Sequence, residues 1–319
     1  MTLLYLSDRF LDHETGRHPE RAERIRQVSR HLQRTGLADR CRRTPWSEAS
    51  IDQIARIHER PYIDDVARFA AAGGGYIEAD TVVSTASFDV ARLAAGAVID
   101  AVTRVVKEDD RRGLCLVRPP GHHALANQAM GFCLFSNVAI GARVATDELG
   151  LDRVLVVDWD VHHGNGTQDM FWTDPRVGFF SIHRWPFYPG TGDWDETGSG
   201  PGLGGTLNLP VTFGTPRHEY VERFTTRLQD FADKLRPQLV LISAGFDAHR
   251  DDPVGSLDLE TEDFQPLTRA VCEIADAHAG GRLVSVLEGG YNTSALAGSV
   301  EVHLGELLAA EARDARPSA

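Results

Sequence analysis

The sequence predicts a single α/β domain with a doubly wound parallel sheet and helices on both faces. Five apolar runs rich in β-branched residues are continuous rather than alternating, as expected for strands that are buried on both faces. These runs lie at residues 114–117, 154–157, 177–182, 239–243 and 283–287. Helical patterns lie between them, and strands that alternate with helices are typical of a doubly wound α/β fold.

The clearest helical pattern covers residues 216–235. Its apolar residues recur at steps of three and four, opposite a charged face, and they are Tyr220, Phe224, Leu228, Phe231 and Leu235. Residues 87–106 and 136–149 also have helical patterns, in which Ser87 and Ser136 are candidate N-caps.

The chain has no internal repeat and no low-complexity linker, so residues 1–319 are expected to form one domain. The glycine-rich stretch at residues 190–205 falls inside the alternation and predicts a long loop. Residues 1–80 predict mostly helix and loop. We expect this segment to pack at the edge of the sheet or over its open end.

The 319-residue chain is acidic, with a formal net charge of −13. Because an acidic surface repels a nucleic-acid backbone, direct binding of nucleic acid is not expected. The same long-range field would weakly favour a cationic substrate such as a lysine side chain or a polyamine. Solubility alone also explains an acidic surface.

The cysteines Cys41, Cys115, Cys133 and Cys272 form no Cys-x-x-Cys pair, and three of them lie in apolar stretches. We therefore expect reduced thiols in the core and a reducing compartment. The N-terminal apolar run has no basic region before it and stops at Asp8, and no stretch reaches the length of a membrane span. The sequence thus predicts a cytoplasmic protein that binds no membrane.

Polar residues follow each of the five predicted strands. The segments are RPPGHHA (118–124), DWDVHHGNG (158–166), HRW (183–185), AGFDAH (244–249) and EGGYN (288–292). Ligands of open parallel sheets bind outside the carboxyl ends of the strands. These aspartates, histidines and one tyrosine are therefore expected to converge on one rim of the sheet.

Asp160 and His162 form the first part of a candidate metal site. They are two residues apart, so in an extended chain their side chains point the same way. A carboxylate and an imidazole suit a zinc-like dication, and a third ligand would leave one coordination position for water. Asp247 is the best third ligand, because a flexible Ser-Ala-Gly segment precedes Phe246. An isolated Asp-x-His motif is more often a solvated acid beside a surface histidine. The metal site is favoured only because Asp247, the tandem histidines and a tyrosine are expected at the same rim of the sheet.

The tandem pair His122–His123 lies in a constrained turn that follows two prolines and a glycine. These imidazoles suit acid–base catalysis near neutral pH, and the alternative is a pair of exposed histidines. Tyr291 follows two glycines, from where its hydroxyl could donate to a developing oxyanion. On local sequence alone, a tyrosine that covers the edge of the core is an equally good interpretation. Cys133 lies among apolar neighbours and is expected in the core.

Six motifs occur here in the order and context of the histone deacetylase family, which includes bacterial acetylpolyamine amidohydrolases. They are RPPGHHA, GFCLFSN, VDWDVHHGNGT, YPGTGD, SAGFDAH and LEGGYN. The resemblance runs from about Arg17 to about Gly305 and is greatest to the class II branch and its bacterial relatives. It implies an arginase-deacetylase fold, one domain with about eight parallel strands, and leaves residues 306–319 as a C-terminal tail.

The resemblance also implies roles for individual residues. Asp160, His162 and Asp247 match the ligands of one catalytic zinc ion. The catalytic side chains match His123 (general base and acid), His122 (its electrostatic partner), Asp158 (the acid behind His122) and Tyr291 (the oxyanion donor).

Further matches surround this centre. The substrate-binding residues match Phe132 and Tyr188 (aromatic walls of an acyl-lysine tunnel), Gly131 beside them, and Asp80 (at the rim). Arg21 matches an arginine that lines an internal channel below the zinc. A structural potassium site beneath the zinc is matched by Asp158, Ser181 and the backbone carbonyls of Asp160, His162 and Ile182.

Two positions depart from the pattern of some relatives. Asn165 stands where some members place an aspartate behind the second histidine, and a neutral partner makes His123 less basic than a carboxylate would. Class II relatives share this asparagine. Val254 stands where the polyamine-selective eukaryotic branch has a gatekeeper glutamate. This weakens the polyamine interpretation, although bacterial polyamine deacetylases build their selectivity from other loops.

The predicted reaction is zinc-dependent hydrolysis of an acyl amide on a primary amine. N-acetyl-lysine side chains of proteins or peptides are the first candidate substrate, and acetylpolyamines are the alternative. A binuclear manganese hydrolase of the arginase or agmatinase type is disfavoured, because Gly164 and His249 stand where carboxylates for a second metal are expected. An inactive acyl-lysine reader is disfavoured, because every catalytic residue of the pattern is present.

Overall fold

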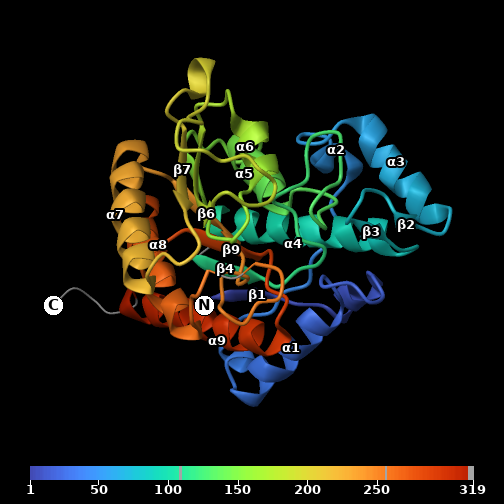
Figure 1. Cartoon of the computed structure of the whole chain (residues 1–319), viewed down its shortest axis with the longest axis horizontal. Coiled ribbons are helices and arrows are strands. Elements are labelled where there is room, and N and C mark those ends of the chain that lie inside the picture. The colour runs from blue at the N-terminus through green and yellow to red at the C-terminus, as the bar shows by residue number, and fades with distance from the viewer. Residues whose placement is uncertain (108–109, 256, 315–319) are drawn as a thin grey trace.

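A computed structural model describes residues 1–107, 110–255 and 257–314 of the chain. Its core is a seven-stranded sheet in which all hydrogen-bonded neighbours are parallel (Figure 1). In sheet order the strands are β1 (Leu3–Tyr5), β4 (Arg112–Cys115), β9 (Leu283–Leu287), β8 (Leu239–Ala244), β5 (Val154–Asp158), β6 (Val177–Arg184) and β7 (Thr206–Val211). A separate antiparallel pair joins β2 (Gly75–Tyr76) to β3 (Val82–Val83).

The α-helices surround this sheet. They are α1 (Glu23–Arg34), α2 (Ile51–Ile54), α3 (Arg60–Ala71), α4 (Ser87–Lys107), α5 (Asn137–Asp147), α6 (Asn165–Phe171), α7 (Arg217–Leu235), α8 (Phe264–Ala279) and α9 (Thr293–Asp314). Short 3-10 turns lie at Asp8–Asp12, Ala38–Arg40, Gly200–Gly202 and Thr261–Asp263.

The predicted α/β class is confirmed. The five apolar runs correspond to β4, β5, β6, β8 and β9. The sequence does not predict β1 and β7, which form the two edges of the sheet. β1 has only three residues, and β7 contains Pro210, which an edge strand tolerates. The resemblance implies about eight strands, whereas the described residues form seven in the main sheet.

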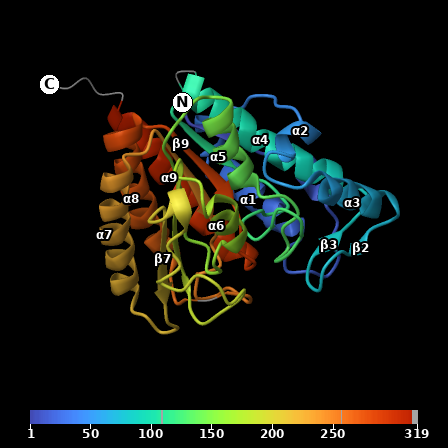
Figure 2. The same ribbon diagram turned by 90° about the horizontal axis from the view of Figure 1, so that it is seen from above.

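Both faces of the sheet are covered. Figure 2 shows α4 and α5 on one side and α7, α8 and α9 on the other. Because successive strand residues point to opposite faces, Val154 and Val156 join the core beneath α4 and α5, whereas Leu155 and Val157 join the core beneath α7, α8 and α9. The continuous apolar runs in the sequence are the direct result of these two cores.

Of the two predicted N-cap residues, one is confirmed in position. Ser136 is the N-cap residue of α5, but its side chain makes no capping hydrogen bond. Ser87 is the first residue of α4 rather than its N-cap, and its hydroxyl accepts from the backbone N–H of Ser84 at 2.7 Å.

The C-terminal residues expected as a tail are helical as far as Asp314, because α9 continues to that residue. Residues 315–319 lie outside the described part of the chain. All four cysteines are free, and Cys115, Cys133 and Cys272 are buried. No helix in the described ranges is both long enough and apolar enough to cross a bilayer.

Residues 1–80 contribute one edge strand and pack their helices against the rest of the domain. α1 lies along α9, and α3 lies beside α4 (Figure 1). The prediction of mostly helix and loop thus holds for this segment apart from β1 and the short strand β2.

Glu20 ties this N-terminal segment to the turn that carries the two histidines. Its fully buried carboxylate accepts hydrogen bonds from Arg118 Nη2 at 2.7 Å and from Arg24 Nη1 at 3.1 Å. Burial alone would raise the pKa of Glu20, but the charge of Arg118 and a hydrogen bond from His13 hold it well below its ordinary value near 4.5. Arg118 lies four residues before His122, so this ion pair fixes the start of the histidine turn.

We expect Glu20→Gln to lower the free energy of unfolding at pH 7 by about 3–5 kcal/mol, because the Arg118 guanidinium stays buried without its counter-charge. A carboxyl whose pKa is lowered by folding stabilises the fold where it is ionised. The difference from the wild type should therefore shrink as the pH falls below about 4.5, the ordinary value. Urea denaturation across this pH range measures both effects.

Glu23→Gln is the matched control, because Glu23 lies in the first turn of α1 and pairs with Arg26 in partly exposed surroundings. We expect a change of at most about 1 kcal/mol for this variant. An equally small change for Glu20→Gln would show that the buried pair contributes little to stability.

Candidate active site

The carboxyl ends of β5 and β8 bring Asp160, His162 and Asp247 together. One potential ligand atom from each residue lies within 4.8 Å of the others, and all three residues are buried. His162 Nδ1 lies 3.1 Å from Asp160 Oδ1 and 3.2 Å from Asp247 Oδ2. Within the described ranges, no other group of three or more histidine, cysteine or acidic side chains is arranged in this way.

Backbone N–H groups orient the two carboxylates. Asp160 accepts from the N–H of His162 at 2.9 Å and from the N–H of Gly289 at 2.8 Å, and Asp247 Oδ1 accepts from the N–H of Val161 at 2.9 Å. The buried Asp247 Oδ2 accepts no well-aligned hydrogen bond from any described residue, despite its proximity to His162. An unsatisfied carboxylate oxygen at this depth is costly unless a cation binds it.

Burial and the mutual interactions of these groups together set the protonation of this cluster. Burial and the charge of Asp160 raise the pKa of Asp247 to about 7. Burial would lower the pKa of His162, but its hydrogen bond to Asp160 and the close carboxylate of Asp247 raise it to about 9. The pKa of Asp160 is lowered, because the charge of His122 and the hydrogen bond from His162 outweigh burial. Each of the three groups thus lies close enough to shift the protonation of the others.

The residues present fit a zinc-like ion. Two carboxylate oxygens and one imidazole nitrogen are a normal donor set for a catalytic zinc site. Two glycines, Gly245 and Gly289, have no side chains and so leave space for the carboxylates of Asp160 and Asp247. A Cβ atom on Gly245 would lie 2.1 Å from Asp160 Oδ2, and a Cβ atom on Gly289 would lie 2.1 Å from Asp247 Oδ2.

The two adjacent histidines have different partners and different charge. His122 Nδ1 donates to Asp158 Oδ2 at 2.9 Å, and although burial lowers its pKa, the charges of Asp158 and Asp160 raise it to about 10. His123 Nδ1 lies 2.7 Å from Asn165 Oδ1, and burial and the charge of His122 lower the pKa of His123 well below its ordinary value. A neutral His123 that donates from Nδ1 keeps Nε2 free to accept a proton.

Glu288 holds the backbone of the histidine turn and has no predicted role. Its Oε2 accepts from the N–H of Gly121 at 2.6 Å and from the N–H of His122 at 3.2 Å, and its Oε1 accepts from Ser243 Oγ at 3.3 Å. Burial raises the pKa of Glu288 to about 7. The signal that could have found it is its position directly after the buried strand β9, because the other acids of the site also lie at or just after a strand end.

Tyr291 packs against Phe132 edge-on, with ring centroids 5.6 Å apart, and burial raises the pKa of its hydroxyl, so the hydroxyl stays protonated. The guanidinium of Arg24 lies 4.9 Å from the centre of the Tyr291 ring, and its Nε donates to the carbonyl of Gly290 at 2.6 Å. The prediction for Arg21 is wrong, because Arg21 is exposed just before α1 begins. The buried arginine beneath Tyr291 is Arg24.

A cavity of about 180 Å³ opens onto this cluster. It is lined by Asp80, His123, Gly131, Phe132, His162, Phe187, Tyr188, Val254 and Tyr291. The Tyr188 ring meets His123 edge-on, with centroids 5.2 Å apart. Phe187, which the sequence does not predict, stacks on His162 with an interplanar angle of 14°. One cavity therefore contains His162 of the candidate metal cluster (Asp160, His162 and Asp247), both candidate catalytic groups His123 and Tyr291, and the expected tunnel residues.

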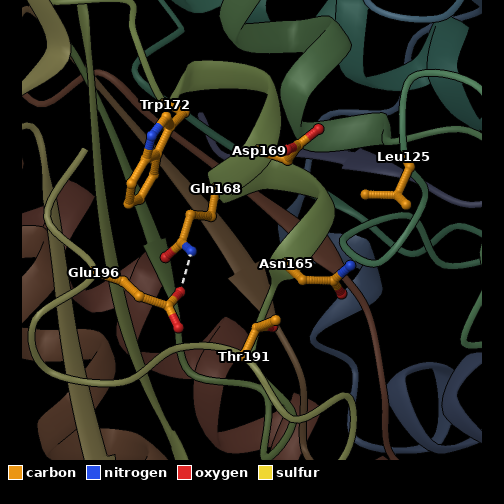
Figure 3. A pocket seen from close by; sticks show the side chains of 7 residues that line it. All are labelled: Leu125, Asn165, Gln168, Asp169, Trp172, Thr191 and Glu196. Atoms are coloured by element: carbon orange, nitrogen blue, oxygen red, sulfur yellow. Dashed lines mark hydrogen bonds between the residues drawn. The ribbon is translucent and has the colours of Figure 1, made fainter. Parts of the chain in front are cut away.

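A larger cavity of about 440 Å³ has Asn165 in its lining (Figure 3). It is lined by Leu125, Asn165, Gln168, Asp169, Trp172, Thr191 and Glu196. Gln168 Nε2 donates to Glu196 Oε2 at 2.5 Å across it. No residue of the metal cluster lines this cavity, so the reactive groups belong to the smaller one. Asn165 connects the linings of the two cavities, because it lines the larger one and contacts His123, which lines the smaller one.

Asp158 and Ser181 lie opposite each other in the register of β5 and β6. Asp158 Oδ1 accepts from the backbone N–H of Asp160 at 3.0 Å, and Ser181 Oγ lies 2.8 Å from His183 Nδ1. The buried Ile182 follows Ser181 in β6. The residues of the expected potassium site are thus neighbours, and the ion itself stays a prediction.

A family model for the histone deacetylase domain matches residues 18–307, which is most of the chain. The chain belongs to the histone deacetylase family. It is 38% identical over 315 residues to histone deacetylase 10, chloroplastic, of Oryza sativa subsp. japonica, covering 93% of this chain and 71% of the relative. It is 37% identical over 276 residues to the histone deacetylase-like amidohydrolase of Pseudomonas aeruginosa, covering 86% of this chain and 73% of the relative.

The fold of this histone deacetylase-family hydrolase agrees with the crystal structure of the HDA15 HD domain. The TM-score is 0.90 at 35% sequence identity, over 97% of this chain and 90% of the other. The recognition made from the six motifs is therefore confirmed, as is the single-domain α/β fold with a central parallel sheet.

Proposed function

We propose that the protein is a zinc-dependent amidohydrolase that removes acetyl or similarly short acyl groups from acylated primary amines. One observation carries the proposal. The cluster of Asp160, His162 and Asp247 adjoins the same cavity as a neutral imidazole, His123, and a protonated phenol, Tyr291. Amide hydrolysis needs these three components, namely a Lewis acid, a base and an oxyanion donor.

Asp160, His162 and Asp247 are the residues that would hold the ion. Zinc bound there would supply Lewis acidity, polarising the acyl carbonyl and lowering the pKa of water. No further carboxylate stands two residues after His162, where Gly164 lies, and this favours one ion over a binuclear centre.

His123 Nε2 accepts a proton from the attacking water and later donates it to the leaving amine. Asn165 keeps the other ring nitrogen, Nδ1, paired and so fixes the direction of Nε2. His122 is hydrogen-bonded to Asp158 and places a second imidazole beside the ring of His123. Tyr291 donates its hydroxyl hydrogen to the oxygen that becomes negative.

The substrate class that we propose is the N-acetyl-lysine side chain of proteins or peptides. Phe132 and Tyr188 flank a cavity of about 180 Å³, which suits a linear aliphatic stem rather than a branched one. Val254 adds an apolar wall at the position where a gatekeeper glutamate would attract a second ammonium group.

Acetylpolyamines are the second candidate, and one feature of the cavity favours them. Asp80 lines the cavity, and its backbone N–H donates to Glu78 Oε2 at 3.3 Å, so a second carboxyl group lies close to this wall. Burial and the neighbouring Glu78 raise the pKa of Asp80. A distal ammonium group would stabilise both carboxylates.

We also propose a structural potassium ion, held by Asp158, Ser181 and the backbone carbonyls of Asp160, His162 and Ile182. The opposed register of Asp158 and Ser181 supports this site.

Kinetics on an acetyl-lysine peptide, acetylputrescine and acetylspermidine, run in parallel on the same zinc-loaded preparation, test the proposal. We expect turnover that a chelator abolishes and zinc restores, with the highest kcat/KM on the peptide. The opposite substrate order would favour the polyamine candidate. A preparation that holds one zinc ion per chain and cleaves none of the three amides would contradict the proposed reaction.

A further inference from the structure

The turn that carries Tyr291 needs external anchors. Tyr291 follows Gly289 and Gly290, which have no side chains to restrict the backbone. Arg24 holds one side of this turn through the carbonyls of Glu288 and Gly290. The opposite side, at the N–H groups of Tyr291 and the residue after it, is held by a different residue.

That residue is Asp252, which lies in the loop after β8 and is 7% exposed. Its Oδ2 accepts from the backbone N–H of Tyr291 at 2.6 Å and from that of Asn292 at 3.2 Å. Its Oδ1 accepts from the N–H of Val254 at 2.9 Å and from that of Gly255 at 3.1 Å. One buried carboxylate therefore satisfies four backbone donors in two segments that are far apart in sequence.

These four bonds link two parts of the active-site cavity. On one side is the oxyanion donor Tyr291, and on the other is the cavity wall at Val254. A second link runs parallel to the first, because Asn292 Nδ2 donates to the carbonyl of Asp251 at 3.0 Å. The side chain of Asp252 faces backbone rather than the cavity, so it acts on the reaction only through what it holds.

We propose that Asp252 is the positioning residue of Tyr291, which sets the distance of the phenol from the metal cluster and couples it to the wall at Val254. This inference rests on the proposed function. A carboxylate suits this task because hydrogen bonds to a charged acceptor are stronger than neutral ones. A displacement of about 1 Å at a reacting group can cost about a hundredfold in rate.

Asp252→Asn and Asp252→Glu test the proposal together. The amide keeps the shape but turns an NH₂ group toward backbone donors, whereas the glutamate keeps the charge but moves the carboxylate. We expect each variant to lower kcat by about ten- to a hundredfold with one zinc ion still bound and KM little changed. Asp251→Asn is the matched control, because Asp251 is exposed in the same loop, and it should keep the wild-type kcat.

A double-mutant cycle separates positioning from a general electrostatic effect on the metal ligands. If Asp252 acts through the phenol, Asp252→Asn should cost less than about threefold in kcat when Tyr291 is already phenylalanine. The full loss in that background would overturn the proposal, as would wild-type kcat in Asp252→Glu.

A readout without catalysis keeps the inference independent of the proposed reaction. The chain has six tyrosines, so fluorine NMR of 3-fluorotyrosine-labelled, zinc-free protein is tractable, with Tyr291→Phe to assign the signal. Asp252→Asn should shift or broaden the Tyr291 signal and leave the other signals in place, whereas Asp251→Asn should leave all of them unchanged. An unchanged Tyr291 signal would refute positioning by Asp252. A wild type that shows no amide hydrolysis would refute only the proposed function.

Discussion

Asp247→Ala is expected to leave the protein unable to hold one zinc ion per chain and to reduce amide hydrolysis to background. Asp247 is one of only three potential ligands in the cluster, and its unsatisfied Oδ2 faces the other two. Loss of a residue that merely supports a ligand costs about 10–100-fold in metal affinity. Loss of a direct ligand should therefore lower the affinity for zinc by more than a hundredfold. Metal analysis after gel filtration, with titration of zinc into stripped protein, measures this.

Asp251→Ala is the control for this experiment, because Asp251 lies in the same loop but its side chain is exposed. It should bind zinc and hydrolyse amides like the wild type. Retention of one zinc ion per chain with unchanged affinity in Asp247→Ala would exclude Asp247 as a ligand and leave Asp160 and His162 without a third partner.

Tyr291→Phe should lower kcat by about a hundred- to a thousandfold, the usual cost of losing one oxyanion donor. The ring contacts with Phe132 and Arg24 do not need the hydroxyl, so stability and zinc content should stay close to those of the wild type. KM should change little, because the hydroxyl acts on the charge that develops in the transition state. Steady-state kinetics with metal analysis separates these effects.

Tyr76→Phe serves as the matched control, since Tyr76 is 68% exposed and does not line the active-site cavity. Its kcat should equal that of the wild type. If Tyr291→Phe also kept the wild-type kcat, stabilisation of the oxyanion would have to come from another group.

The position of the candidate site was predictable because its chemistry is local to the strand ends. Asp160, His162 and Asp247 follow strands β5 and β8, and parallel strands place all such residues at one edge. The two edge strands were not predictable. β1 is too short to show a periodic pattern. β7 is defined by its pairing with β6, which the local sequence does not reveal.

The residues that support the site were harder to predict for a physical reason. Asp252 and Glu288 bind backbone N–H groups, which carry no signal in the side-chain pattern. Arg24 had a weak signal, since it lies four residues before the buried Val28 and shares its helical face, whereas Arg21 precedes the helix. Only the tertiary arrangement distinguishes these two arginines.

The close approach of Asp160 and Asp247 to Gly245 and Gly289 has a consequence for protein engineering. Even an added methyl group at either glycine would overlap a carboxylate of the candidate metal site. In a saturation screen, these two chemically inert positions should tolerate substitution as poorly as the acids themselves. Mutant libraries that aim at new substrate specificity are therefore better directed at cavity-lining residues such as Asp80 and Val254, with both glycines kept constant.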